Sequence, residues 1–334
     1  MLVSIVIPTR NRCDLLRETM ASVYAQTYAD WEAIIVDDGS TDGTEEMVKA
    51  MAATERRLRY LRRQRNPQGA STCRNLGITA ANGEYIIFLD SDDLLAPTCL
   101  EGRIQVMKEN PKLDFVVFLT QVFREVRGDR PYLWNTFTQE NDLDRLLRRD
   151  SPWQTTGPLW KKASLALIGE WDERALSAQD WEFNIRAIAA GLTYEKIPEI
   201  DSYWRDTRAG SISNSWGNTR KLCNRVRLHR RIIEILRAKG LVTRKRQRIL
   251  MSEYYKHAFV FNNSRRLAHR IWARGRRDKV IGRFEYNLII LGDILWRSAR
   301  RLNEFMVAKI IPETRLSSTH TVALLAPTKK ITKP

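Results

Sequence analysis

The sequence predicts an α/β fold in which a doubly wound, mainly parallel sheet is flanked by helices and followed by a C-terminal α-helical region. Over the first 120 of 334 residues, short β-branched runs alternate with stretches of helical periodicity, which is typical of parallel strands joined by crossover helices. From Asn218 the pattern changes to long, Arg-rich helices with little Gly or Pro between them. We therefore place a boundary near residues 210–218.

Strands and helices alternate regularly in the first part of the chain. Apolar, β-branched runs predict strands over Val3–Ile7, Ala33–Val36, Leu58–Leu61 and Tyr85–Leu89. The stretches after them predict helices over Cys13–Gln26, Thr41–Ala52, Ala70–Ala81 and Thr98–Glu109. In the first helix, for example, apolar residues recur on one face, namely Leu15, Leu16, Met20 and Val23. Because the carboxyl ends of parallel strands meet at one edge of a sheet, we expect a ligand at that edge.

The middle of the chain has a mixed pattern, and the last third is helical. In the middle we predict a strand over Asp114–Leu119, turns near Gly128 and Asp150, a helix over Asp180–Ala190 and a strand over Tyr194–Ile197. Long helices follow over Leu222–Ala238, Arg246–Trp272 and Arg283–Ile311. We divide the chain into a domain over 1–213, with halves 1–110 and 111–213, a basic helical region over 214–311, and a flexible tail over 312–334.

Charged and reactive side chains are unevenly distributed. The first 200 residues carry 25 basic and 30 acidic side chains, whereas the last 134 carry 31 and 9. The four cysteines form no C-x-x-C pair, so we expect neither a zinc ribbon nor a disulfide scaffold, and we expect a cytoplasmic location. We also expect no signal peptide and no membrane-spanning helix. All four histidines follow residue 228, so chemistry in the first two thirds must use carboxylates, hydroxyls and a metal.

Two of the predicted strands run into clusters of acidic residues. The second strand ends in Asp37 and Asp38, and the fourth is followed by Asp90, Asp92 and Asp93. Neither cluster has the glycine pattern of a dinucleotide site or a P-loop. Alternate side chains of an extended segment share a side, so Asp90 and Asp92 together suit Mg²⁺ or Mn²⁺, which bind carboxylates and substrate phosphates. The alternative is that these residues are solvated turn acids or a helix cap.

The order of several motifs resembles glycosyltransferase family 2 over about residues 1–213. The motifs are Ser4–Asn11, Val36–Asp42, the N…G-A-S…R-N…G segment from Asn66 to Gly77, Gly83–Asp93, Leu159–Lys162, Ile168–Glu173 and Gln179–Arg186. The resemblance implies a GT-A fold and a nucleotide-sugar donor, most often a UDP-sugar, with GDP and dTDP open. Residues 1–110 would then bind the nucleotide-sugar, and 111–213 would hold the acceptor and the catalytic residue.

The resemblance also implies roles for individual residues of the first half. Pro8 and Asp38 would line the nucleotide pocket, with Asp38 accepting a hydrogen bond from the base and Asp37 beside it. Asp90 would lie by the ribose and the metal, and Asp92 would be the main metal ligand. The resemblance also suggests that Arg74 touches the diphosphate, although an ion pair with a strand-end aspartate is the alternative.

Asp180 matches the position where the family places its general base, usually within a Glu-Asp pair. Here Gln179 precedes it, which removes a neighbouring charge and keeps the key carboxylate. Asp180 would deprotonate an acceptor hydroxyl that attacks the anomeric carbon, so a single displacement would invert its configuration. Alternatively, Asp180 caps its helix and Glu182 is the base. Trp181 forms either a wall of the acceptor pocket or part of the core.

Downstream of this helix, Tyr203–Ser213 resembles the closing loop of the family. A histidine often precedes its Gly-Ser-Ile-Ser stretch, and this chain has Arg208 there. The substitution makes a histidine metal ligand doubtful and suggests that Arg205 or Arg208 contacts the diphosphate as a cation. A surface arginine without that role is the alternative.

The basic helical region leaves its partner open. In the helix predicted over Arg283–Ile311, apolar residues recur at helical spacing beside arginines, which suits either an anionic membrane surface or packing on neighbouring helices. Nucleic acid would also match the positive charge, but we find no binding motif for it. We therefore expect a metal-dependent, inverting glycosyltransferase that acts on a glycan or a lipid-linked precursor of cell-surface polysaccharide, and that lies on the inner face of the membrane. The alternative is a nucleic-acid-binding or non-catalytic carbohydrate-binding protein on a degenerate GT-A scaffold.

Overall fold

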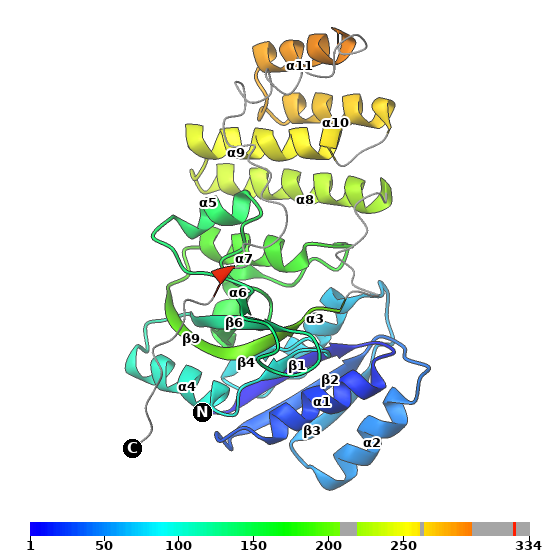
Figure 1. Ribbon diagram of the computed structural model, residues 1–334, viewed down its shortest axis with the longest axis vertical. Coiled ribbons are helices and arrows are strands. Elements are labelled where there is room, and N and C mark those ends of the chain that lie inside the picture. The colour runs from blue at the N-terminus through cyan, green and yellow to red at the C-terminus, as the bar shows by residue number, and fades with distance from the viewer. Residues whose placement is uncertain (208–218, 261–263, 296–322, 325–334) are drawn as a thin grey trace.

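A single mixed sheet forms the centre of the first two hundred residues. The computed structural model describes residues 1–207, 219–260, 264–295 and 323–324 (Figure 1). The sheet path runs β10-β7-β6-β8-β4-β1-β2-β3, and β9 pairs with both β5 and β6. Its strands are β1 (Val3–Thr9), β2 (Trp31–Asp37), β3 (Leu58–Arg62), β4 (Tyr85–Phe88), β5 (Leu94–Leu95), β6 (Phe115–Phe123), β7 (Tyr132–Leu133), β8 (Pro158–Lys161), β9 (Tyr194–Arg205) and β10 (Ala323–Leu324).

The first four strands are parallel, as the alternating sequence pattern predicts. β1 lies between β2 and β4, and β3 pairs with the outer side of β2. Antiparallel pairs of β8 with β4 and with β6 extend the sheet. Helices α1 (Cys13–Tyr24), α2 (Thr44–Thr54) and α4 (Cys99–Glu109) share one apolar core with the sheet. Helices α3 (Ala70–Ala80), α6 (Lys162–Ile168) and α7 (Gln179–Ala189) share a second core, so the sheet is covered on both faces.

The C-terminal helices stack on one another, away from the parallel strands (Figure 1). They are α8 (Thr219–Ala238), α9 (Arg244–Tyr255), a π-helical segment (Lys256–Val260), α10 (Arg265–Arg277) and α11 (Arg283–Leu295). Their apolar residues form one core with α7 and the short helix α5 (Asp142–Leu147), to which α7 contributes Trp181 and Ile185. The basic helical region is therefore packed onto the domain that precedes it.

Several elements differ from the predicted ones. β9 continues to Arg205, although the apolar pattern stops at Ile197, because Pro198 lies at a register shift against β6 that lets the strand bend and continue. The helix predicted over 246–272 is broken, since the side chain of Ser264 caps a new helix by accepting a hydrogen bond from the Leu267 amide. Of the predicted tail, the structure describes only Ala323–Leu324, which pair with β7 as a short strand.

Close packing of α3 on β1 depends on Gly77. A Cβ atom at this position would lie 2.2 Å from Cγ1 of Val6 in the middle of β1. The missing side chain lets α3 approach the sheet, and α3 carries Arg74 and Asn75 toward the ends of the parallel strands.

Candidate active site

The loops that follow the parallel strands meet at one edge of the sheet, as predicted. Pro8 and Thr9 of β1 lie opposite Val36 and Asp37 of β2, and Phe88 of β4 lies opposite Val6. The segments that contain Asp38 and Asp90 therefore leave the sheet on either side of the carboxyl end of β1. Pro8 itself is buried in the strand, so its predicted contact with a nucleotide stays a prediction.

Asp37 shapes the loop that follows β2. One oxygen of its buried carboxylate accepts hydrogen bonds from the amides of Gly39 and Ser40 and from the Ser40 hydroxyl. The other oxygen accepts from the Tyr60 hydroxyl at 2.8 Å. Desolvation and this hydrogen bond raise the pKa of Tyr60. Both oxygens of the Asp37 carboxylate are thus engaged by hydrogen bonds within the protein.

Asp38 faces a basic segment on the neighbouring loop. Its carboxylate pairs with the guanidinium of Arg63, accepts a 3.2 Å hydrogen bond from the Gly69 amide, and lies 3.9 Å from Arg10. Burial, together with the negative charge of Asp38, raises the pKa of the Cys73 thiol to about 12, so this cysteine stays protonated. Asp38 therefore holds the loop over 66–69 against the strand edge.

Arg74 joins the second acidic cluster to the loop before α7. Its buried guanidinium donates a 2.7 Å hydrogen bond to Asp90 and lies 4.6 Å from the centre of the Trp171 ring. Asn75 fixes the same loop, because it donates to the Trp171 carbonyl and to Glu173. The ion pair named as an alternative for Arg74 is thus present, and it lies at the edge of the sheet where a diphosphate is expected.

Asp92 is paired with Arg12, which follows β1. The two charged groups are 2.5 Å apart, and about a fifth of the Asp92 side chain is exposed. Burial and the neighbouring charge of Asp90 raise the pKa of Asp92, while Arg12 acts in the opposite direction. Two carboxylates on one short loop, each held against a single guanidinium, are hard oxygen donors that suit Mg²⁺ or Mn²⁺. The residues present therefore fit the expected metal.

Asp93 and Arg205 form contacts that hold the acidic loop after β4 in place. Asp93 is completely buried and accepts hydrogen bonds from the Arg205 amide and the Thr156 hydroxyl. The Arg205 side chain donates to the Asp92 carbonyl, pairs with Glu18 and stacks on Phe123. Arg205 thus fixes the acidic loop from the end of β9. The other arginine predicted for the diphosphate, Arg208, lies outside the described residues.

Asp180 lies in the first turn of α7. It is half-buried, and among the described residues its carboxylate forms no hydrogen bond or ion pair. Ala178, the preceding N-cap residue, has left-handed backbone angles (φ 58°, ψ 38°), an unfavourable conformation for a residue with a side chain. Its side chain cannot cap the helix, so the free amides and the dipole of the helix N-terminus lie near Asp180.

The two residues after Asp180 belong to the interior. Trp181 is buried, donates a 2.6 Å hydrogen bond to the Leu146 carbonyl and packs under the Arg149 guanidinium. Glu182 is fully buried and binds Arg186 through both of its oxygens. Trp181 is therefore core, as one of its two interpretations predicted. Glu182, the alternative general base, is therefore held in a buried ion pair.

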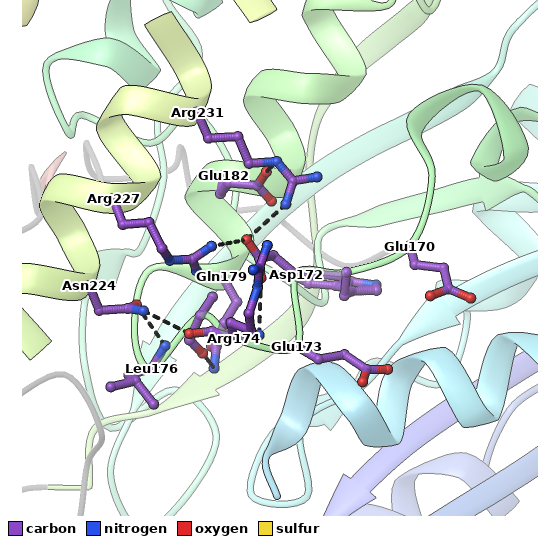
Figure 2. A network of polar contacts seen from close by, with 12 residues as sticks. Glu170, Asp172, Glu173, Arg174, Leu176, Gln179, Glu182, Asn224, Arg227 and Arg231 are labelled. Carbon is purple, nitrogen blue, oxygen red and sulfur yellow. Dashed lines mark hydrogen bonds and ion pairs between the residues drawn. The ribbon is translucent and has the colours of Figure 1, made fainter. Parts of the chain in front are cut away.

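The loop before α7 is held by α8 (Figure 2). Figure 2 shows Arg227 and Arg231 extending from α8 to the buried carboxylate of Asp172. Each guanidinium donates a hydrogen bond of 2.8 Å to this carboxylate. Asn224, one turn earlier, accepts a hydrogen bond from the Leu176 amide and donates to the Arg174 carbonyl. The basic helical region thus fixes the segment that leads into Asp180.

Sequence reasoning missed two arginines of this site. Arg12 and Arg63 follow β1 and β3, and each faces a predicted site carboxylate. The carboxyl ends of parallel strands meet at one edge of the sheet, and this holds for β1 and β3 as well as for the strands that precede the acidic clusters. Applied to the basic residues after these two strands, the same rule predicts that Arg12 and Arg63 lie at that edge.

The chain is similar in sequence to known glycosyltransferases. Residues 4–162 match the family model of glycosyl transferase family 2. Over 167 residues the chain is 40% identical to glycosyltransferase GlyG of Streptococcus pneumoniae, which covers 50% of this chain and 54% of GlyG. Over 108 residues it is 38% identical to the putative teichuronic acid biosynthesis glycosyltransferase TuaG of Bacillus subtilis, covering 32% and 42%. The chain spans only 15–17% of the length of three Rickettsia glycosyltransferases that it matches.

Solved structures share the fold. TarS 1-349 of S. aureus, in complex with UDP-GlcNAc, has a TM-score of 0.63 at 20% identity, covering 78% of this chain and 74% of that one. The mannosyltransferase PcManGT of Pyrobaculum calidifontis, with GDP-Man and Mn²⁺, has a TM-score of 0.51 at 17% identity, covering 93% and 84%. The fold is of the GT-A type. Through residues 4–162, this chain is similar to glycosyl transferase family 2.

Proposed function

We propose that this protein is an inverting glycosyltransferase that moves a sugar from a nucleotide diphosphate to a hydroxyl acceptor. The observation that carries the proposal is the edge of the parallel sheet, where Asp38, Asp90 and Asp92 each lie against an arginine. Such a mixed edge suits a ligand that has both a hydrogen-bonding base and a charged diphosphate.

In this proposal the donor half of the site orients the nucleotide. Asp38 and Pro8 face the base, while Arg74 and Arg12 lie where they stabilise phosphate charge. Asp92 and Asp90 would hold Mn²⁺ or Mg²⁺, which when bound neutralises the leaving diphosphate. Proteins of similar fold support a nucleotide-sugar donor and a metal ion, since TarS is solved with UDP-GlcNAc and PcManGT with GDP-Man and Mn²⁺. We propose a UDP-sugar as the donor.

Asp180 is proposed as the general base. Its carboxylate accepts the proton of the acceptor hydroxyl as that oxygen attacks the anomeric carbon. A single displacement needs no carboxylate nucleophile, so the configuration at the anomeric carbon inverts. Glu182 is bound to Arg186, which leaves Asp180 as the first-turn carboxylate of α7 with no ion pair among the described residues.

The first test is calorimetric titration of UDP, GDP and dTDP, with and without Mn²⁺, into the wild-type protein and Asp92→Ala. Metal-dependent binding of one nucleotide that Asp92→Ala abolishes supports the donor site and identifies its base. Asp14→Ala is the matched control, because that side chain is 91% exposed. If a folded wild-type protein binds none of the three nucleotides, the transferase proposal fails and a non-catalytic role becomes the better explanation.

The acceptor class is proposed from the relatives. TuaG is named for teichuronic acid biosynthesis, which supports a cell-surface polysaccharide precursor as the acceptor. The test is transfer of radiolabelled sugar from the identified donor to glycan and lipid-linked fractions of the source cell, with Asp180→Asn as the blank. Label in neither fraction, from a protein that binds its donor, would overturn this assignment.

We also propose that α10 and α11 meet an anionic membrane surface. Phe284 and Leu291 of α11 are 74% and 50% exposed, and Arg266, Arg270 and Arg277 are exposed on α10. Apolar side chains beside exposed arginines suit an interface that is both apolar and negatively charged. Among the described residues, no helix is long and apolar enough to cross a membrane.

Vesicle sedimentation tests this surface. We expect binding to vesicles rich in phosphatidylglycerol and not to pure phosphatidylcholine, with a loss of binding in the double variant Phe284→Ser, Leu291→Ser. Val126→Ser is the matched control, since Val126 is 69% exposed on a distant turn. Equal binding to both vesicle types, or an unchanged double variant, would contradict the proposal.

A further inference from the structure

Three buried side chains with metal-ligating atoms meet within the C-terminal helices. They are His229 of α8, Glu253 of α9 and His257 of the π-helical segment, with exposed fractions of 1%, 2% and 2%. One ligand atom from each lies within 4.8 Å of the other two. The cluster is separate from the proposed donor site, because none of its residues comes from the strand-end loops.

His229 is oriented as a ligand. Its Nδ1 lies 2.9 Å from the Arg225 carbonyl, and because a carbonyl only accepts, Nδ1 carries the hydrogen. Nε2 is therefore the nitrogen with the free lone pair, and it lies 4.0 Å from Oε2 of Glu253. This buried Nε2 has no hydrogen-bond partner within the described part of the chain. Metal-binding histidines are commonly held by such a bond from the opposite ring nitrogen.

The backbone brings the other two residues to the same side. α9 passes at Lys256 into a π-helical turn, a distortion that is frequent at functional sites. Glu253 and His257 are one turn apart along this segment. The His257 ring lies 4.7 Å from the His229 ring, centre to centre, in an edge-to-face arrangement.

We propose that His229, Glu253 and His257 form a zinc site that fastens α8 to α9. Two imidazoles and one carboxylate are a donor set of Zn²⁺, whereas Asp90 and Asp92 offer only the oxygen atoms that Mg²⁺ and Mn²⁺ prefer. Small side-chain rotations would bring the three ligand atoms closer together, to zinc–ligand distances of about 2.0–2.2 Å.

Nearby charges set the conditions for binding. Lys256 donates a 2.7 Å hydrogen bond to Oε1 of Glu253, and Arg149 lies 3.8 Å from Oε2. Because like charges repel, Lys256 must leave Glu253 when zinc binds, and its long flexible chain permits this. Arg149 is stacked on Trp181 at 3.6 Å and remains beside the site.

The site would stabilise the helix that bears the proposed base. The His229 ring lies 4.8 Å from the ring of Trp181, the residue that follows Asp180. An ion between α8 and α9 would therefore fix the core against which the first turn of α7 packs. The role is structural, and it is independent of whether the protein transfers sugar.

The test is zinc binding to metal-free Asp92→Ala protein, in which the donor-site ligand is removed. We expect one zinc per chain by competition with a chromophoric chelator, a visible Co²⁺ spectrum of tetrahedral intensity, and a higher Tm with zinc. His229→Gln and Glu253→Gln should each weaken binding by more than the roughly 10–100-fold that loss of an outer-shell partner causes. His269→Gln, on α10 outside the cluster, is the matched control and should bind as before.

Lys256→Met gives a test that does not depend on the folding of ligand variants. Removing the competing ammonium should tighten zinc binding at least severalfold. No zinc bound by the Asp92→Ala protein overturns the proposal, as does full binding in His229→Gln. Unchanged or weaker binding in Lys256→Met places any bound ion away from Glu253 and overturns the proposal as well.

Discussion

The guanidinium of Arg12 lies 2.5 Å from the carboxylate of Asp92, so the expected main metal ligand is paired with a cation from its own chain. The two residues are 80 positions apart in sequence and meet because β1 and β4 are neighbours in the sheet. Asp92 has Asp90 close by, and a nearby positive charge favours its ionised form. Arg12 therefore holds the acidic loop, and it would compete with the proposed metal ion for the same oxygen.

Arg12→Gln should bind free Mn²⁺ more tightly than the wild-type protein. An ion pair of this partial exposure is worth up to about 1 kcal/mol, so release of Asp92 should strengthen Mn²⁺ binding by up to about fivefold. The loss of free-ion electron paramagnetic resonance signal during titration measures it. Arg17→Gln, which removes an exposed arginine paired with Asp14, is the control. Equal or weaker Mn²⁺ binding in Arg12→Gln would show that Arg12 does not compete at Asp92.

Asp180→Asn and Glu182→Gln should separate catalysis from folding. Asp180→Asn should lower kcat by about 10²–10⁴-fold with little change in donor binding or Tm, because its carboxylate forms no hydrogen bond or ion pair among the described residues. Glu182→Gln should instead lower the free energy of unfolding by about 3–5 kcal/mol, because it leaves Arg186 buried without its carboxylate. Donor turnover and thermal unfolding of both variants provide the measurements.

The opposite pattern would reverse the assignment. If Glu182→Gln folds like the wild-type protein and loses turnover while Asp180→Asn keeps it, the base is Glu182. Anomeric analysis of the product by NMR adds a separate check, since retention of configuration would exclude a single displacement.

The parallel strands and their edge could be predicted because the signals are local. The strands β1 to β4 and the helices between them each have their own periodicity, and the strand-end rule then places Asp38 and Asp90 at one edge. The elements that were missed, such as β5 and α6, are too short to show a period. The end of β9 was missed because Pro198 hides a strand that continues beyond a bulge.

Side-chain roles were harder to predict, because they depend on contacts between distant residues. Glu182 and Asp180 are both first-turn carboxylates of α7, and only Arg186 and Arg231 show that Glu182 is engaged. Trp181 could be core or pocket wall until α5 and α8 were placed against it. The hold of α8 on the loop before α7 depends likewise on residues about 50 positions apart.

Gly77→Ala should destabilise the fold, although the substituted position is not in the acidic loops. The new methyl group would lie 2.2 Å from Val6 Cγ1 in a central strand, so α3 or β1 must shift. Overpacking of this kind costs about 1–3 kcal/mol, which urea unfolding followed by circular dichroism resolves. Gly102→Ala is the control, because its Cβ would meet only ordinary contacts at 3.9 Å. Equal stability of the two variants would mean that α3 has room to move.

The Asp172 carboxylate should make the free energy of unfolding fall as the pH is lowered. Burial alone would raise its pKa, but hydrogen bonds and charge from Arg227 and Arg231 lower it below the ordinary value. In the unfolded chain an aspartate has a pKa of about 3.9. As the pH falls through about 4 the unfolded state therefore takes up the proton first, and the stabilisation present above this range is lost.

Asp172→Asn should consequently be less stable near pH 7 by about 1.5–3 kcal/mol, and its stability should fall less steeply between pH 5 and 3 than that of the wild-type protein. Urea unfolding at several pH values measures both effects, and Asp14→Asn at the exposed surface should change neither. Because Asp172 ties α8 to the loop before Asp180, the variant should also lower turnover while the nucleotide binds as before. A variant with the wild-type pH slope would mean that Arg227 and Arg231 do not stabilise the Asp172 carboxylate.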